Sequence, residues 1–174
     1  MRVNNIDLDV LTEFANEVKK DLTKAKKSKQ VECTWKLEEG EPQVEAVVQF
    51  RMGEALLQAD FAPFMGGSGL APDPLQYCLF GLASCFASTF ATTAATEGIK
   101  LESLTVSAQN FIDLSKTLGL SNNPIVEKVK FTVRVKSEAP SESLERLEKL
   151  SKERCPAVFC LTQPISLETE VEKV

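Results

Sequence analysis

The chain has 174 residues, of which 43% are hydrophobic and 26% are charged, and its formal net charge is −5. This length and balance fit one globular domain and argue against a disordered chain. The net negative charge argues against a nucleic-acid partner, because phosphate binding needs a basic face. Residues 1–9 lack the basic start and apolar core of a signal peptide, so we expect a cytoplasmic protein.

The sequence contains no histidine, which excludes Ser-His-Asp and Cys-His catalysis and imidazole ligands for zinc. Any catalysis must therefore use thiols, carboxylates, lysine, arginine or Tyr77. The chain has five cysteines, an odd number that fits poorly with a disulfide framework in a cytoplasmic protein. They are Cys33, Cys78, Cys85, Cys155 and Cys160. Their spacing does not match a structural zinc motif, and we expect neither a metal nor a cofactor.

The N-terminal half begins with apolar residues at three- and four-residue spacing, which predict an amphipathic helix over residues 5–28. We treat residues 1–29 as a helical extension and residues 30–174 as the main domain. Alternating segments at 30–37, 43–50 and 55–61 predict three strands in an antiparallel meander. Cys33 shares a face with Trp35 there, which favours a packing role.

The second half begins after a glycine- and proline-rich loop at residues 63–74. Asp73 as N-cap and Pro74 as first helical residue predict a long helix that ends near Glu97, before Gly98. Strands are expected at 101–113 and 126–136, a helix at 141–154 and a closing strand at 164–173. The predicted class is α+β.

Residues 75–95, within the long helix, contain no charged side chain. This length could span a bilayer, but six hydroxyl residues and the lack of an aromatic belt or basic anchor argue against a membrane span. A helix that is apolar all round is instead buried on all sides. One chain of this size has difficulty covering such a helix, so we predict a homodimer that buries it.

Two of the cysteines have neighbours that suggest chemistry. Cys85 lies seven residues after Cys78 in the predicted helix, so both point to roughly one side. Cys155 precedes Pro156, which favours a new helical turn whose free N–H groups would favour a thiolate, with Arg154 adding positive charge. For Cys78 and Cys160 we expect packing as small apolar residues.

Three segments resemble the OsmC/Ohr family of thiol-dependent peroxidases, in the family's order. They are "GGSGLAPDPLQYCLFGLASCFAST", "GIKLESLTVSAQ" and "RCPAVFCLTQPISLETEV". The resemblance covers roughly residues 30–174 and implies an intertwined homodimer with a buried central helix. It also implies that Cys85 attacks an organic hydroperoxide, that Cys155 resolves the sulfenic acid to a disulfide, and that a dithiol reductant reopens it.

The sequence departs from the family at the groups that activate the thiol. The glutamate that follows the helix-opening proline in family peroxidases is replaced by Leu75, and the first strand turn, "LEEGEP", is acidic where the family has an arginine. Arg51 lies in the next turn. Leu75, Gln76, Cys78 and Arg51 are therefore candidate pocket residues. Two alternatives to a peroxidase follow: a divergent member that binds a small apolar ligand at the dimer interface, and a redox sensor.

Overall fold

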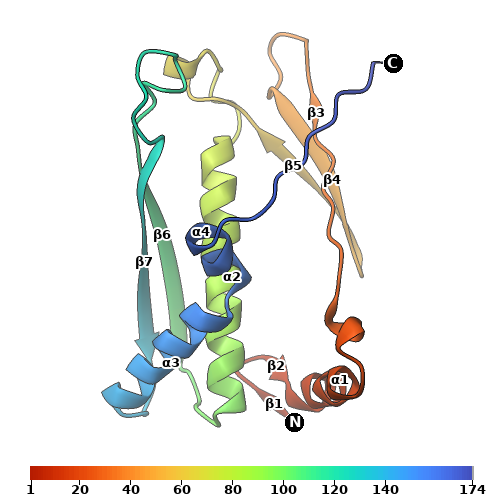
Figure 1. Cartoon of the computed structure of the whole chain (residues 1–174), viewed down its shortest axis with the longest axis vertical. Coiled ribbons are helices and arrows are strands. Elements are labelled where there is room, and N and C mark those ends of the chain that lie inside the picture. The colour runs from red at the N-terminus through yellow and green to blue at the C-terminus, as the bar shows by residue number, and fades with distance from the viewer. Residues whose placement is uncertain (174) are drawn as a thin grey trace. The chain divides into compact units, whose positions relative to one another are not determined.

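Helices alternate with antiparallel strands along the chain, which confirms the predicted α+β class (Figure 1). The structure is a computed structural model that describes residues 1–173. It forms two compact units, one of Met1–Leu8 with the chain from Gly81 onward, and one of Asp9–Phe80. The strands are β1 (Arg2–Val3), β2 (Ile6–Asp7), β3 (Thr34–Trp35), β4 (Val44–Phe50), β5 (Gly53–Ala59), β6 (Ser103–Ile112) and β7 (Val126–Lys136). The α-helices are α1 (Leu8–Lys20), α2 (Pro74–Thr96), α3 (Ser141–Arg154) and α4 (Pro156–Thr162).

The first residues form a small hairpin, β1–β2, where a helix from residue 5 was predicted. Asn4 and Asn5 have φ angles of 51° and 63°, the left-handed conformation that a tight hairpin turn requires and that asparagine tolerates. The Asn4 side chain also donates to the Ile99 carbonyl and accepts from the Leu101 N–H, each at 2.8 Å. These bonds anchor the hairpin to the segment that follows α2.

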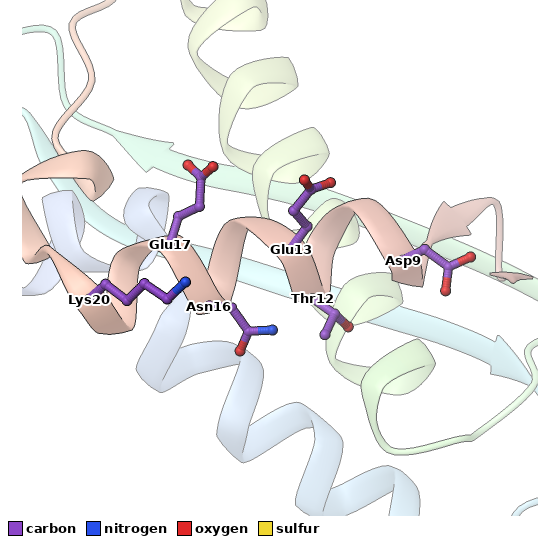
Figure 2. Close-up of a pocket in the computed structure, with 6 residues that line it drawn as sticks. All are labelled: Asp9, Thr12, Glu13, Asn16, Glu17 and Lys20. Carbon is purple, nitrogen blue, oxygen red and sulfur yellow. The ribbon is translucent and has the colours of Figure 1, made fainter.

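Helix α1 is amphipathic as predicted but ends at Lys20, eight residues earlier than expected. The Asp21 carboxylate accepts from the Thr23 N–H at 3.0 Å and caps a short 3₁₀ helix instead, which competes with continuation of α1. Figure 2 shows the polar face of α1, along which carboxylates alternate with neutral polar groups and a terminal lysine. Acidic Asp9 in the first turn and lysines in the last turn follow the helix dipole.

The predicted meander of the Asp9–Phe80 unit is confirmed as the antiparallel sheet β3-β4-β5. Its β4–β5 hairpin pairs Val44 with Ala59 and Phe50 with Gly53. Strand β3 is only two residues long, and Cys33 before it is exposed, so the predicted packing of Cys33 is wrong for the chain by itself. Trp35 contacts Phe61 with ring centroids 6.4 Å apart.

The glycine-rich loop that leads to α2 is organised by the buried carboxylate of Asp60. One oxygen accepts from the N–H groups of Ser68 at 3.1 Å and Leu70 at 2.9 Å. The loop folds back so closely on the segment after β5 that a Cβ atom on Gly67 would lie 2.0 Å from the Phe61 carbonyl oxygen. Only glycine fits this approach.

Helix α2 begins and ends at the predicted residues. Asp73 accepts from the Leu75 N–H at 2.8 Å, and Gln76 accepts from the Asp73 N–H at 2.9 Å, which is a reciprocal capping box. At the other end Gly98 has φ of 74°, and the Ile99 N–H donates to the Ala94 carbonyl at 2.8 Å. This pattern is a Schellman stop.

Several hydroxyl groups of α2 bond to the helix's own backbone. Thr89 donates to the Cys85 carbonyl at 3.0 Å, and Thr93 donates to the Thr89 carbonyl at 2.8 Å. The helix is long and apolar enough to cross a membrane, but one such helix is weak evidence because core helices share this composition. Within one chain, only 28% of the most apolar 18-residue stretch of this helix is buried.

The core of the other unit packs α2 and α3 on the β6–β7 hairpin, whose register runs from Ser103 opposite Lys136 to a bulge near Ile112. Its buried residues are Phe86, Phe90, Ala94, Leu147 and Cys155. The predicted strands at 101–113 and 126–136 and the helix at 141–154 are confirmed to within a few residues.

The closing strand predicted at residues 164–173 is not formed in this chain. The segment alternates in hydropathy, but its large apolar residues, such as Leu167 and Val171, are exposed and no strand of residues 1–173 pairs with it. The alternation of apolar and polar residues therefore predicted a strand, but none of residues 1–173 forms a strand beside it.

Candidate functional site

The junction of α3 and α4 positions Cys155. Pro156 disfavours helical geometry at the preceding residue, and Cys155 is extended with φ of −82° and ψ of 119°. It therefore ends α3 and serves as N-cap of α4, with Pro156 in the first helical position, as predicted. Cys155 is only 2% exposed, so this junction carries its thiol into the core.

Helix α2 brings Cys85 to the same place. The Sγ atoms of Cys85 and Cys155 lie 3.7 Å apart, although 70 residues separate them in the sequence. The backbone N–H of Ala157, in the first turn of α4, lies close enough to Cys85 to lower the pKa of its thiol. The two cysteines are not joined by a disulfide in this structure, and a modest approach of the sulfurs would bring them to the disulfide length of about 2.05 Å.

The surroundings of the thiol pair are apolar. Phe86, next to Cys85, is 1% exposed and stacks on Phe131 with ring centroids 5.2 Å apart. Ala157 and Val158 of α4 pack against the same core cluster. The described side chains that pack around the thiol pair are apolar and uncharged, so they would favour contact with an apolar organic molecule.

This environment raises the pKa of the Cys85 thiol above its ordinary value. Burial is the largest cause, because it disfavours the charged thiolate. The Ala157 N–H acts in the opposite direction, whereas the hydrogen bond and charge of Cys155 and the charge of Cys160 raise the pKa further. Cys85 is therefore mostly protonated at neutral pH, and its reactivity should increase as the pH rises.

The other predicted pocket residues belong to the Asp9–Phe80 unit. Leu75 is exposed, and Gln76 serves in the capping box of α2. Arg51 lies exposed in the turn between β4 and β5. Cys78 is exposed in this chain. Its predicted packing would require a second chain to bury it. A role for these four residues beside the thiol pair stays a prediction.

Two features of the site were not predicted. Free N–H groups were expected at the Cys155–Pro156 helix start for the Cys155 thiol, but the Ala157 N–H acts on Cys85 instead. Cys160 was expected to pack but is exposed, because it faces outward from the short helix α4. It lines a cavity of ≈ 540 Å³ together with Phe131, Val158 and Lys152.

The fold and the site together define a class: an α+β protein with two reduced cysteines held in contact inside an apolar core. A family model described as OsmC-like protein matches residues 66–170. The chain therefore belongs to the OsmC-like protein family. No curated protein sequence matches it.

Solved structures of the same fold include the OsmC-like protein of Mycoplasma pneumoniae, with 19% identity, a TM-score of 0.53, and coverage of 78% of this chain and 89% of that one. The organic hydroperoxide resistance protein OsmC of Legionella pneumophila is 19% identical, with a TM-score of 0.55 and coverage of 79% and 92%. An organic hydroperoxide resistance protein of Elizabethkingia anophelis is 17% identical, with a TM-score of 0.57 and coverage of 79% and 91%. At this identity the likeness establishes the fold.

Proposed function

We propose that this protein is a thiol-dependent peroxidase that reduces organic hydroperoxides, with Cys85 as the peroxidatic and Cys155 as the resolving residue. The observation that carries the proposal is the 3.7 Å separation of their Sγ atoms in an apolar site. Membership of the OsmC-like family supports it, as do relatives of the same fold that are hydroperoxide resistance proteins.

The chemistry needs only the two thiols and a reductant. The Cys85 thiolate attacks the terminal oxygen of the hydroperoxide, the O–O bond breaks, and the departing alkoxide takes a proton to leave as an alcohol. Cys85 is then a sulfenic acid. The Cys155 sulfur attacks the Cys85 sulfur, water leaves, and the disulfide forms. A dithiol reductant returns both thiols by two exchange steps.

The substrate class follows from the lining of the site. Phe86, Phe131 and Val158 favour an apolar organic group over the small, strongly hydrated hydrogen peroxide. The raised pKa of Cys85, with burial as its first cause, predicts slow turnover at neutral pH. Leu75, in place of the family's glutamate, fits the same expectation.

A homodimer is part of the proposal, because one chain leaves much of α2 uncovered. Phe80 is 71% exposed, and Leu75 and Cys78 are exposed as well. A second copy would bury this uncharged surface at a reduced polar cost, because helix hydroxyls such as those of Thr89 and Thr93 already bond to the helix backbone. We propose a cytoplasmic location, with neither a membrane nor nucleic acid as partner.

The test is consumption of cumene hydroperoxide in the presence of a dithiol reductant. Cys85→Ser should abolish turnover. Cys155→Ser, oxidised without the reductant, should form no Cys85–Cys155 disulfide and should carry a sulfenic acid at Cys85. Cys33→Ser, at an exposed cysteine of the other unit, is the matched control and should retain activity. Full activity in Cys85→Ser would overturn the proposal.

A second candidate function is binding of a small apolar ligand. It is favoured by an almost wholly apolar cavity of ≈ 260 Å³ in the Asp9–Phe80 unit, lined by Val44, Leu57, Pro74 and Tyr77 among others. The Tyr77 hydroxyl donates to the Gln58 carbonyl at 2.8 Å, so it is satisfied and leaves the cavity apolar. Thermal unfolding with and without fatty acids or aromatic ligands tests this candidate. An unchanged midpoint with every ligand would count against it.

A further inference from the structure

Strand β7 has one edge without a neighbouring strand. Among residues 1–173, β6 is the only strand that pairs with it, so the backbone N–H and C=O groups that point away from β6 form an open sheet edge. Phe131, Val133 and Val135 pack against the core, and the residues between them point to the opposite face. Four residues of that opposite face are basic and exposed. They are Lys128, Lys130, Arg134 and Lys136, which we call the basic stripe.

The neighbouring strand β6 does not neutralise the middle of the basic stripe. The register places the neutral Gln109 opposite Lys130. It places the neutral Thr105 opposite Arg134. Lys136, at the end of the strand, forms an ion pair within the chain. Because opposite charges on adjacent strands stabilise their pairing, the open edge of β7 favours an acidic strand as its neighbour.

Residues 164–173, which we call the C-terminal segment, have the complementary pattern. Large apolar residues occupy odd positions and acids occupy even positions. They are Ile165, Leu167 and Val171, and Glu168, Glu170 and Glu172. All six are exposed, and Val171 reaches 96%. As a strand beside β7, the segment would place its acids next to the basic stripe and its apolar side chains on the face that packs against the core.

The C-terminal segment does not approach β7 of its own chain. Figure 1 shows it leaving α4 on the side away from the β6–β7 hairpin. Its apolar side chains are therefore left in solvent, and the edge of β7 is left open. A second copy of the chain supplies a strand of the right charge and alternation. Under two-fold symmetry each copy gives one strand and receives one, so the exchange closes as a dimer.

We propose that the C-terminal segment of one copy pairs with the open edge of β7 in a second copy, with its glutamates beside Lys130 and Arg134. This pairing satisfies the edge N–H and C=O groups of both strands. It also removes the apolar residues of the segment from water. The inference rests on the homodimer of the proposed function and not on its peroxide chemistry.

A carbodiimide cross-link tests the pairing, because this reagent joins a carboxylate and an amine that are in contact through an amide bond. Two full chains with different affinity tags are co-expressed. One carries Lys128→Arg/Lys130→Arg, and the other carries Glu168→Gln/Glu170→Gln/Glu172→Gln. A link from an acid of the segment to Lys128 or Lys130 can then form only between the two chains. We expect this link, mapped by mass spectrometry in a species of twice the chain mass.

Charge exchange supplies a second readout that a loss of folding would not imitate. Lys130→Glu/Arg134→Glu should weaken dimerisation about tenfold in sedimentation velocity of a dilution series, and Glu168→Lys/Glu172→Lys should weaken it by a similar factor. The four changes together in one chain should restore the dissociation constant to within about threefold of wild type.

The matched control for the acidic pair is Glu142→Lys/Glu145→Lys, which makes the same change of net charge at exposed positions of α3 and should leave dimerisation nearly unchanged. Absence of both the interchain link and the rescue would overturn the inference. Links confined to single wild-type chains would overturn it too, because the segment would then pair with its own chain. A dimer without the link that still consumes cumene hydroperoxide leaves the proposed function intact. A linked dimer that consumes no hydroperoxide overturns the peroxidase proposal alone.

Discussion

Phe86 is the side chain on which the core around the thiol pair depends most directly. It is 1% exposed, and its ring stacks on Phe131 at 5.2 Å with an interplanar angle of 24°. Truncation of a buried phenylalanine to alanine costs about 3–5 kcal/mol, through lost burial and the cavity left behind. That is a large part of the roughly 5–15 kcal/mol that stabilises a typical domain. Phe86→Ala should therefore lie close to the limit of folding.

The milder variants Phe86→Leu and Phe131→Leu make the prediction quantitative. Their double-mutant cycle should give a coupling free energy of about 0.5–1.5 kcal/mol for the ring pair. Urea unfolding followed by far-ultraviolet circular dichroism is the assay, because the single tryptophan, Trp35, lies in the other unit and its fluorescence reports separately. Phe64→Ala, at a ring that is 78% exposed, is the control and should change stability by less than about 0.5 kcal/mol. An equally small effect of Phe86→Ala would refute this description of the core.

Three further predictions concern pH and the loop before α2. Because burial raises the pKa of Cys85, the rate of its alkylation by iodoacetamide should still be rising at pH values where the alkylation of a free thiol in solution has reached its plateau. The same shift stabilises the fold below the ordinary thiol pKa and is lost as the pH rises through the raised one, so alkaline pH should lower the unfolding midpoint less in Cys85→Ser. Asp60→Ala removes a buried acceptor of two backbone N–H groups and should cost about 2 kcal/mol in urea unfolding, whereas Glu41→Ala, at an exposed ion pair, should cost almost nothing. Gly67→Ala should destabilise by about 1–3 kcal/mol, because its Cβ would overlap the Phe61 carbonyl oxygen, and an unchanged thermal midpoint would contradict the close approach.

Local chemistry made much of the fold predictable from sequence. Asp73, Pro74 and Gly98 fixed both ends of α2, because N-caps and C-terminal glycines act through neighbouring backbone groups alone. Pro156 likewise placed Cys155 at a helix start. The position of Cys155 beside Cys85 came from family resemblance, since no local rule relates residues so far apart in the chain.

The misses arose where the outcome depends on partners outside the segment. Residues 164–173 alternate like a strand, but no strand among residues 1–173 lies beside them. The Asn4–Asn5 turn was not predicted, because the prediction from sequence extended the helical spacing of apolar residues in α1 back to residue 5. The exposure of Cys33, Cys78 and Cys160 could not be inferred from the sequence. A cysteine among apolar residues is predicted to be buried, and the sequence does not show whether its side chain points to the core or to solvent.

The measurement that tests the central claim most directly is intact mass and disulfide mapping of the reduced protein after one equivalent of cumene hydroperoxide. The proposal predicts a loss of two hydrogens per chain, with Cys85 linked to Cys155. Hydrogen peroxide should react more slowly, because the apolar site favours an organic substrate. Free thiols at Cys85 and Cys155 after prolonged exposure to both oxidants would contradict a peroxidase and leave the cysteines as packed core residues.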